Sequence, residues 1–533
     1  MPPTVPAVDA TSADGAAGGW TDAAQVVWLP TADEIAAIDR HAVACGATSE
    51  RVLIETAGRE VARQIHRRHP VGRAVALAGS GHNGADCLVA ARTLRTWGWE
   101  VAAVQCGSRM PEPDVTGGWG LEWSDAGSLA AACRDADLIL DGLLGTGARG
   151  APRGRLSAVI EEVNAMGVPL VAVDGPSGVD FTTGGVEGAC VRADLTVTLG
   201  WPKLGLLMYP ARRYCGELVA VEIGFPPPHE PPAARAITGR WIASLLRGRA
   251  GDAHKGEAGY LTVVAGQEGM AGAAVLAGRA ASRAGAGIVR IVSDPANREI
   301  IQESVPDAVY APWDSDDAVR ESVGWAHAIV LGPGLGRSSD RRRLAELVLE
   351  ARGERPVLID ADGLNAWAGD IDDLAARLRP SDVVTPHPGE LARLLGTELS
   401  AVQGARVASA RATAERLGCA VLLKGAPSLL AAGGESKGEL RVATTGGNAL
   451  AAGGTGDILS GASGAYLAAG YAAPDAVSVA LLLTGVAAEL GPHAIGHAAS
   501  DVPDRIPGVR AAVETLGPPP EPEVVFRAAA PSA

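Results

Sequence analysis

The sequence contains few aromatic residues and no closely paired cysteines, and each scarcity restricts the kind of protein it can be. Aromatic residues make up 4% of the 533 positions, whereas 69 positions are glycine. Small side chains suit α/β proteins in which helices pack closely on a sheet. The seven cysteines include no C-x-x-C pair, and their number is odd. This pattern argues against a disulfide framework or a zinc site and indicates free thiols in a reducing compartment.

Excess positive charge and long apolar runs are also absent. The formal net charge is −15, which disfavours nucleic acid as a partner because nucleic-acid binding needs basic surface. No apolar run reaches the length of about 18 residues that a membrane span requires. The run at 477–490 is shorter and contains Ser, Thr and Glu, and residues 1–20 lack the basic start of a secretory signal. We therefore expect a cytoplasmic protein that binds no membrane.

Proline gathers in one segment at 224–241, with the sequence GFPPPHEPPAARAITGRW. Proline at this density interrupts helices and strands, so the segment is typical of a spacer. A second Pro- and Ala-rich stretch follows Pro503. The sequence therefore predicts a disordered leader at 1–20, a first domain at 21–225, a linker at 226–237, a second domain at 238–505 and a loose tail at 506–533.

Both predicted domains alternate short apolar runs with segments of helical spacing. Strands are predicted in the first domain at 73–79, 135–142 and 167–175, with a helix at 86–98. Strands are predicted in the second domain at 260–266, 326–334, 355–363, 382–390 and 420–428. Such runs indicate parallel sheets covered by helices on both faces. The fold class is therefore α/β, with ligands expected at the carboxyl ends of the strands.

The stretch GGTGDILSG at 453–461 places a carboxylate directly after a glycine-rich turn. The turn would present backbone N–H groups at a helix N-terminus, which is a ready site for phosphate. A carboxylate there would repel phosphate, so Asp457 needs a reason to be present. Two interpretations are open: Asp457 is a general base that deprotonates a hydroxyl attacking phosphorus, or it caps the helix.

Other residues of the second domain favour the phosphate interpretation. LGPGLGR at 331–337 permits a close approach of the backbone to a ligand, and Lys424 ends a predicted strand, in position for a phosphate chain. His387 lies between two prolines at a strand end, where it could contact a ligand or serve only as a buried structural histidine. No G-x-x-x-x-G-K-[ST] motif occurs, which excludes a P-loop enzyme.

The first domain carries oxygen ligands at its predicted strand ends. GSGHNGADCLVAAR at 79–92 lacks the G-x-G-x-x-G spacing of a dinucleotide fingerprint, which disfavours a nicotinamide-dependent dehydrogenase. The oxygen-bearing side chains are Asn83, Asp86, Asp141, Asp174 and Ser177. Hard cations prefer such ligands, although Asp, Asn and Ser also fill turns without binding anything.

Motifs in both domains resemble known families. KGEAG, GMAGAA, GPGLG, TPHPGE, LKGAPS and GGTGDILSG occur in this order and resemble the NAD(P)H-hydrate dehydratase branch of the ribokinase-like superfamily. NGADCLVAAR, DGLLGTG, VAVDGPSGVD and ADLTVTLGWPKLGLL resemble the NAD(P)H-hydrate epimerase domain. The resemblance extends over residues 30–500. It implies an N-terminal Rossmann-like three-layer αβα domain and a C-terminal ribokinase-like αβα domain.

The resemblance implies a bifunctional enzyme, an isomerase and a lyase, that repairs hydrated NADH and NADPH (NADHX and NADPHX). The N-terminal domain would interconvert the R and S epimers of the hydrate. The C-terminal domain would dehydrate the S epimer with ADP, restoring NAD(P)H and releasing AMP and phosphate. The implied cofactors are K⁺ in the epimerase domain and Mg²⁺ with ADP in the dehydratase domain. We also expect a homo-oligomer.

The resemblance assigns roles to individual residues. The catalytic residues would be Asp457 in dehydration and Asp174 in epimerisation. In the epimerase domain the hydrate would contact His82, Asn83, Gly84, Ala85, Asp86, Gly145, Thr146, Gly147, Ala148, Arg149, Gly150, Ala151 and Asp174, and K⁺ would bind Asn83, Asp141 and Ser177. In the dehydratase domain the hydrate would contact Ala273, Gly336, His387 and Asp457, and ADP would contact Lys424, Gly425, Ala426, Pro427, Ser428 and Gly456.

Besides His82, which stands where the family usually has asparagine, three positions of the first domain depart from the family pattern. Ala85 and Cys87 stand in a motif that is usually N-N-G-G-D-G, and Gly175 replaces the usual isoleucine. A methyl group at position 85 would hinder a close backbone approach or a positive φ, and Cys87 adds bulk at a helix start. An alternative therefore stays open: a ribokinase-like, ATP-dependent small-molecule kinase whose N-terminal domain is a non-catalytic nucleotide-binding module.

Overall fold

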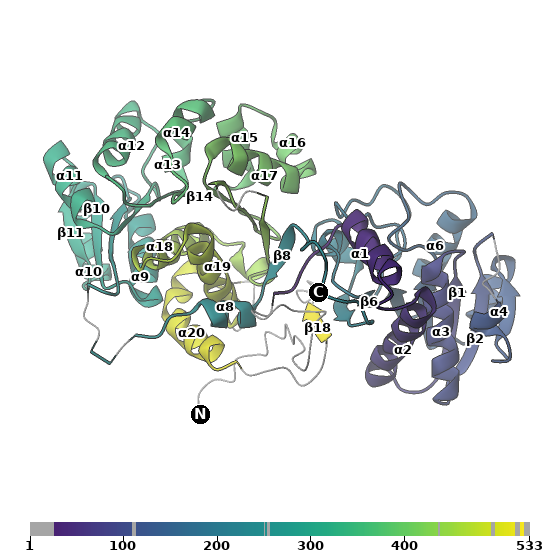
Figure 1. Cartoon of the computed structure of the whole chain (residues 1–533). Helices are drawn as coiled ribbons and strands as arrows, with labels where there is room; N and C mark the ends of the chain where they lie inside the picture. Colours follow the sequence, from purple (N-terminus) through teal and green to yellow (C-terminus); the bar gives the residue numbers. More distant parts are fainter. Residues whose placement is uncertain are drawn as a thin grey trace. The chain divides into compact units, whose positions relative to one another are not determined.

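The computed structural model describes residues 26–108, 113–249, 251–252, 256–434, 438–491, 496–516 and 523–526. These residues form two compact units, which are 26–235 with 523–526, and 236–516 (Figure 1). The predicted leader at 1–20 lies outside the described residues. Within the described part of the chain, no helix combines the length and the apolar character that crossing a bilayer would require.

The first unit is built on an eight-stranded sheet with the order β18-β7-β6-β5-β4-β1-β2-β3. Its strands are β1 (Arg73–Ala78), β2 (Glu100–Gln105), β3 (Glu122–Asp125), β4 (Leu138–Gly142), β5 (Leu170–Val173), β6 (Leu195–Leu199), β7 (Glu217–Val221) and β18 (Glu523–Phe526). All neighbours are parallel except β18, which runs antiparallel to β7. The chain reverses its direction across the sheet between β1 and β4, which is where ligands bind in such folds.

Helices cover both faces of this sheet. They are α1 (Ala32–Ala44), α2 (Glu50–Arg68), α3 (His82–Thr96), α4 (Pro113–Thr116), α5 (Leu129–Ala132), α6 (Arg155–Ala165) and α7 (Leu204–Leu207). Successive residues of β1 serve opposite faces: Ala74 and Ala76 join the core under α1–α3, whereas Val75 and Leu77 join the core under α5 and α6. The result is the three-layer α/β arrangement that the sequence predicts.

The second unit is built on a ten-stranded sheet with the order β11-β10-β9-β12-β13-β14-β15-β16-β17-β8. Its strands are β8 (Ala234–Ile237), β9 (Tyr260–Val264), β10 (Ile288–Ser293), β11 (Val309–Pro312), β12 (Ala328–Leu331), β13 (Val357–Ile359), β14 (Val383–Val384), β15 (Ala420–Leu423), β16 (Leu429–Ala431) and β17 (Leu440–Ala443). The strands from β11 to β15 are parallel, and β16 pairs antiparallel with both of its neighbours.

Two groups of helices lie on either side of the second sheet (Figure 1). One group comprises α8 (Gly239–Leu245), α9 (Ala271–Ala284), α10 (Arg298–Ser304), α18 (Thr455–Ala468), α19 (Ala473–Glu489) and α20 (Ile506–Glu514). The other helices are α11 (Asp316–Trp325), α12 (Ser339–Ala351), α13 (Asp362–Asn365), α14 (Ile371–Arg377), α15 (Pro388–Leu395), α16 (Leu399–Gly404) and α17 (Arg406–Leu417). Glycine lets the first group pack closely, because a Cβ on Gly461 would lie 2.0 Å from the Ala277 carbonyl oxygen.

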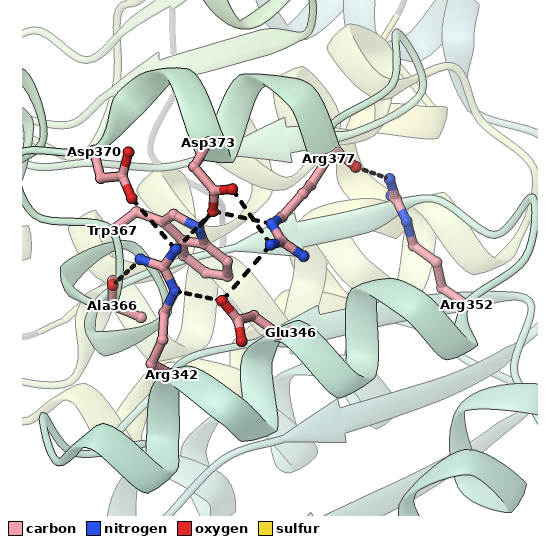
Figure 2. A network of polar contacts seen from close by, with 8 residues as sticks. All are labelled: Arg342, Glu346, Arg352, Ala366, Trp367, Asp370, Asp373 and Arg377. Atoms are coloured by element: carbon pink, nitrogen blue, oxygen red, sulfur yellow. Dashed lines mark hydrogen bonds and ion pairs between the residues drawn. The ribbon is translucent and has the colours of Figure 1, made fainter.

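A polar network fixes the segment that follows β13 (Figure 2). Asp373 accepts hydrogen bonds from the Trp367 indole at 2.9 Å, from Arg342 at 2.6 Å and from Arg377 at 3.0 Å. The bonds from Arg377 and Trp367 lower the pKa of Asp373. Arg342 also donates to the Ala366 carbonyl at 2.8 Å. The network therefore links α12 and α14 to residues 366 and 367, which follow α13.

The structure confirms every strand that the sequence predicts and corrects the boundaries of the linker and tail. Residues 234–237 were expected in the linker but form strand β8. The tail was expected to be loose, yet residues 506–514 form helix α20 and residues 523–526 pair with β7. Each of these elements is short and adjoins proline-rich sequence, so local pattern does not distinguish it from its surroundings.

Candidate active sites

The first unit contains a cavity of about 830 Å³ at the carboxyl ends of β1, β4 and β5. Its lining includes the apolar side chains of Ile35 and Leu53, from the first two helices. It also includes the polar side chains of Asn83, Asp86 and Asp174. A cavity of this size, mostly apolar with a few converging polar groups, is typical of a small-molecule site.

Asp174 follows β5 and is held in an uncommon backbone conformation. Its φ is +66°, a left-handed value that is costly for a residue other than glycine. One carboxylate oxygen, Oδ1, accepts from the Leu199 N–H at 3.0 Å and from the Thr198 hydroxyl at 3.2 Å, and it also accepts from the Lys203 ammonium. The Lys203 side chain is 1% exposed. A buried ion pair therefore fixes the Asp174 carboxylate at the cavity wall.

Asn83, Asp141 and Ser177 meet beside the same cavity. Asp141 is fully buried and accepts from the Ser177 hydroxyl at 2.6 Å and from the Ser177 N–H at 2.8 Å. Burial raises the pKa of Asp141 to about 6, although the bonds from Ser177 oppose the rise. The Asn83 amide donates to the Leu144 carbonyl at 2.9 Å, and the Leu144 N–H donates to the Ser177 hydroxyl at 2.9 Å.

The Asn83 side chain also carries a buried oxygen that needs a partner. Its Oδ1 atom forms no hydrogen bond with any residue that the structure describes. A buried polar atom left unsatisfied is costly, and such an atom commonly marks the place of an unseen ion or water. Together with the Asp141 carboxylate and the Ser177 hydroxyl, it forms a set of oxygen ligands that suits a hard cation.

The other predicted residues of the first site divide into two groups. His82 and residues 145–148 line the cavity with Asn83, Asp86 and Asp174. Gly84, Ala85 and residues 149–151 are not part of the lining. Gly84 permits a close backbone contact, since a Cβ there would lie 2.3 Å from the Gly79 carbonyl oxygen. Arg149 donates to the Thr146 carbonyl at 2.7 Å and thereby closes the loop that carries the lining residues.

The structure accommodates the three departures from the family pattern. Ala85 lies in helix α3 and does not have the positive φ that a methyl group would disfavour. Cys87 packs against β4, where a Cβ on Gly142 would lie 2.3 Å from the Cys87 Cβ. A Cβ on Gly175 would lie 2.4 Å from the Phe181 ring, so the aromatic ring occupies the space that a larger residue at 175 would need.

The second candidate site lies at the start of α18. Gly454 is the N-cap residue and makes no side-chain cap, and Asp457 is the third residue of the helix. Asp457 is therefore not the cap that one interpretation of the sequence predicted. Burial, and next the nearby carboxylate of Asp360, raises the pKa of Asp457 from 3.8 to about 7, while Lys424 opposes the rise. A carboxyl group that titrates near neutral pH is suited to act as a general base.

Lys424 interacts electrostatically with Asp457 and forms ion pairs with two further acidic residues. Its ammonium group lies 2.5 Å from Asp360 and 3.7 Å from Glu390. These carboxylates raise the pKa of Lys424 against the effect of its burial. Asp360 also accepts from the Ser460 hydroxyl of α18 at 2.7 Å. A Cβ on Gly456 would lie 3.5 Å from the Lys424 Nζ atom, so the first turn of α18 adjoins the lysine.

Gly334, Gly336 and Ala273 also lie near this site. Gly336 has a φ of +88°, and a Cβ there would lie 2.0 Å from the Gln267 side chain. Its N–H donates to Asp362 at 3.0 Å. Ala273 lies beside the same loop, since a Cβ on Gly334 would lie 2.9 Å from the Ala273 Cβ. This loop, the first turn of α9 and residue 362 therefore lie together.

His387 is half-exposed and caps helix α15. Its Nδ1 atom accepts from the Gly389 N–H at 2.9 Å and from the Glu390 N–H at 3.2 Å. The ring therefore carries its proton on Nε2, which lies 3.3 Å from the Glu390 carboxylate. Burial, and next the charge of Lys424, lowers the pKa of His387. The ring is therefore not the fully buried structural histidine that the sequence left possible.

The segment 424–428 connects β15 to β16 and is ordered by an arginine from α17. Arg406 donates to the carbonyls of Pro427 at 2.7 Å, Ala426 at 3.0 Å and Lys424 at 3.3 Å. The Gly425 N–H donates to the Ser428 hydroxyl at 3.3 Å. Arg406 therefore fixes the carbonyl groups of this loop. Through Lys424, the loop adjoins the first turn of α18.

Sequence reasoning missed four residues of these sites: Lys203, Asp360, Asp362 and Glu390. All lie within stretches that were recognised as motifs or strand ends, and Asp360 directly follows strand β13. The signal that separates them from ordinary polar residues is burial with an opposite charge, which arises only when distant segments fold together.

Two α/β units, each with buried acidic residues at the carboxyl ends of its parallel strands, define a two-domain enzyme. Comparison with known proteins agrees. A family model described as NAD(P)H-hydrate dehydratase matches residues 261–507. A model described as YjeF-related protein N-terminus matches residues 50–205.

Relatives match over most of the chain. The bifunctional NAD(P)H-hydrate repair enzyme Nnr of Escherichia coli (strain K12) is 34% identical over 472 residues, covering 87% of this chain and 89% of that protein. The enzyme of the same name from Salinibacter ruber is 34% identical and covers 91% and 96%. The chain belongs to the family of bifunctional NAD(P)H-hydrate repair enzymes, as its motifs predicted.

A solved structure is also similar to the second domain. The ADP/ATP-dependent NAD(P)H-hydrate dehydratase from Bacillus subtilis, co-crystallised with ATP and Mg²⁺, is 30% identical. It covers 52% of this chain and 98% of that chain, with a TM-score of 0.46.

Proposed function

We propose that this chain repairs hydrated NADH and NADPH through two successive reactions. The N-terminal domain interconverts the R and S epimers of the hydrate. The C-terminal domain uses ADP to dehydrate the S epimer, restoring NAD(P)H and releasing AMP and phosphate. The observation that carries the proposal is the carboxyl group of Asp457, whose pKa is raised to about 7 in the first turn of a helix beside Lys424.

Dehydration requires a poor leaving group to be converted into a good one. Asp457 takes the proton from the hydroxyl of the S hydrate, and the oxygen attacks the terminal phosphorus of ADP, releasing AMP. The C–O bond to phosphate then breaks as the ring nitrogen donates its electron pair, and loss of a proton from the neighbouring ring carbon forms the C=C bond of NAD(P)H. The N–H groups at the start of α18 and the Lys424 ammonium group would balance the charge of the transferring phosphoryl group.

The contacts expected for this domain follow from the same arrangement. ADP would lie along residues 424–428 and Gly456, with the hydrate at Ala273, Gly336, His387 and Asp457. Mg²⁺ would accompany the nucleotide. Among the residues that the structure describes, no three His, Cys, Asp or Glu side chains converge as a metal site. This fits a magnesium ion held largely by phosphate oxygens and water.

In the N-terminal domain, Asp174 would serve as an acid or base, with the hydrate at residues 82–86 and 145–151 around it. K⁺ would be held by Asn83, Asp141 and Ser177, and the unsatisfied Asn83 oxygen supports this assignment. A bound potassium ion would supply a fixed positive charge beside the cavity. The buried Asp141 carboxylate would then be ionised and paired.

The experiment separates the two reactions by substrate. The chain is incubated with purified S hydrate or R hydrate and either ADP or ATP, and the recovery of the reduced-nicotinamide absorbance is followed. We expect rapid recovery from the S epimer with ADP, and recovery from the R epimer at a rate above its spontaneous epimerisation. A kinase with a non-catalytic N-terminal module would leave the R epimer to its spontaneous rate. Failure to recover absorbance from the S epimer would contradict the proposal.

We further propose a cytoplasmic homo-oligomer that binds neither nucleic acid nor membrane. The cysteines are free, and six of the seven are buried, which suits a reducing compartment. The net charge of −15 disfavours nucleic acid. Val43 and Val52 are exposed on the first two helices and offer apolar surface to a second copy. Light scattering would measure the oligomeric state, and the mass of a monomer would contradict the proposed homo-oligomer.

A further inference from the structure

We propose that Asp86 and Asp174 act as an acid and base pair in the N-terminal cavity, and that Lys203 is the positioning residue that holds the Asp174 carboxylate. The pair deepens the proposed epimerisation and rests on it. The two carboxyl groups line one cavity and are both more than nine-tenths buried. They differ in their partners, and this difference assigns their roles.

Asp174 is arranged to carry a negative charge. Its Oδ1 atom receives the Leu199 N–H, the Thr198 hydroxyl and the Lys203 ammonium group. Lys203 in turn donates to the Leu199 carbonyl at 2.7 Å and to the Thr198 hydroxyl at 3.1 Å. The ammonium group is therefore fixed by three acceptors and is 1% exposed. These donors all contact Oδ1, so they fix the carboxylate and leave its other oxygen available to accept a proton.

Asp86 is arranged to keep its proton. It is the fifth residue of α3, and no hydrogen bond to its carboxyl group comes from the described residues. Burial, and next the negative charge of Asp174, raises the pKa of Asp86 well above its ordinary value, and Lys203 opposes this only in part. Two neighbouring carboxyl groups whose environments differ in this way divide into an acid and a base.

The other charged groups around the cavity do not reverse this assignment. Asp39 of α1 adds negative charge, which also raises the pKa of Asp86. Glu50 of α2 pairs with His82 at 2.8 Å, and both side chains are largely exposed to water. Arg153 and Arg155 lie at the cavity rim beyond β4, and Arg155 pairs at 3.8 Å with Asp125. The buried cation of the cavity wall is Lys203, which bonds to Asp174.

The pair allows a balanced exchange of the hydroxyl group. Asp86 gives its proton to the hydroxyl, the C–O bond breaks, and water leaves while the ring nitrogen forms a C=N bond with the same carbon. Water then adds to the opposite face of that carbon, the C=N electrons return to nitrogen, and Asp174 takes the released proton. Transfer of this proton back to Asp86 through cavity water completes the cycle. The reverse reaction uses the same groups.

The test uses the full-length chain with R hydrate and ADP, so that epimerisation must precede dehydration. Removing a general acid or base costs about 10²–10⁴ in rate, and we expect Asp86→Asn to lower R-hydrate turnover by this factor. The falling alkaline limb of its pH profile should also disappear. We expect Lys203→Met to lower turnover of R hydrate, because the Asp174 carboxylate then loses the ammonium group that holds it. Lys203→Arg should restore turnover.

Turnover of S hydrate in the same samples reports the C-terminal domain and serves as an internal control. Glu161→Gln removes an exposed carboxylate of α6 that is not part of the cavity lining, and it should turn over R hydrate at the wild-type rate. Near-ultraviolet circular dichroism of buried Trp99 and Trp201 checks that each variant retains the N-terminal fold. Wild-type turnover of R hydrate by Asp86→Asn or by Lys203→Met would overturn the pair. Absence of S-hydrate turnover by the wild-type chain would instead overturn the proposed function.

Discussion

Replacing Asp457 by asparagine should remove dehydration and, at the same time, stabilise the C-terminal domain. Asparagine is nearly isosteric but cannot accept the proton of the attacking hydroxyl. Loss of a general base costs about 10²–10⁴ in rate. We therefore expect S-hydrate turnover to fall by this factor in Asp457→Asn while R and S epimers still interconvert.

The expected gain in stability follows from the pKa of the carboxyl group. The pKa of Asp457 rises from 3.8 to about 7 in the folded chain. Stability associated with its neutral form is fully present below pH 3.8 and is lost as the pH rises through about 7. Each unit of pKa shift corresponds to about 1.36 kcal/mol, so the charged carboxylate lowers the free energy of unfolding by at most about 4 kcal/mol. Partial exposure to water reduces this to about 1–3 kcal/mol.

Denaturant unfolding of the wild-type chain and Asp457→Asn at acidic and alkaline pH measures this effect. The variant should exceed the wild type by the full amount only at alkaline pH. Asp475→Asn is a matched control, because Asp475 occupies the third position of α19 as Asp457 does in α18. It pairs with Arg441 at 2.7 Å, so its removal should stabilise nothing and should leave dehydration unchanged. Retained dehydration by Asp457→Asn would refute the role of base, and an unchanged unfolding free energy at alkaline pH would refute the electrostatic argument.

Three further predictions concern other residues. Asp360→Asn releases the Lys424 ammonium group and should lower dehydratase kcat by tenfold or more at an unchanged rate of epimerisation, measured with separated epimers. Gly175→Val should destabilise the N-terminal domain by about 1–3 kcal/mol in chemical denaturation, because its side chain meets the ring of Phe181; adding Phe181→Leu should restore part of the loss. Asn83→Leu should remove any acceleration of epimerisation by potassium chloride over sodium chloride, and acceleration that persists in this variant would exclude the proposed potassium site.

Sequence patterns predicted strands β1, β4 and β5 of the first sheet and strands β9 and β12 to β15 of the second, because each of these strands carries a strong local signal. An apolar run such as 138–142 ends in Asp-Gly, and the strand stops where the polar residue appears. The same rule placed Asp141, Asp174 and Asp457 at the carboxyl ends of strands or the start of a helix. Such positions follow from local order along the chain and need no knowledge of distant partners.

The partners of these residues could not be predicted in the same way. Lys203 bonds to Asp174 across 29 positions of sequence, and Lys424 bonds to Asp360 across 64. No local spacing distinguishes such a lysine from a solvated surface residue. For a similar reason, the sequence did not predict that the fold accommodates glycine at position 175. The ring of Phe181 occupies the space beside Gly175 only in the folded turn.

Strand β18 has a consequence for the synthesis of this chain on a ribosome. The first sheet receives its antiparallel edge from residues 523–526, so translation of the second domain must precede completion of the first. Until then, β7 presents unpaired N–H and C=O groups that can recruit a foreign strand. The roughly 300 residues between the two strands take on the order of 15–60 s to translate at about 5–20 residues per second. Nascent chains are therefore open to aggregation or chaperone capture at this edge throughout that interval.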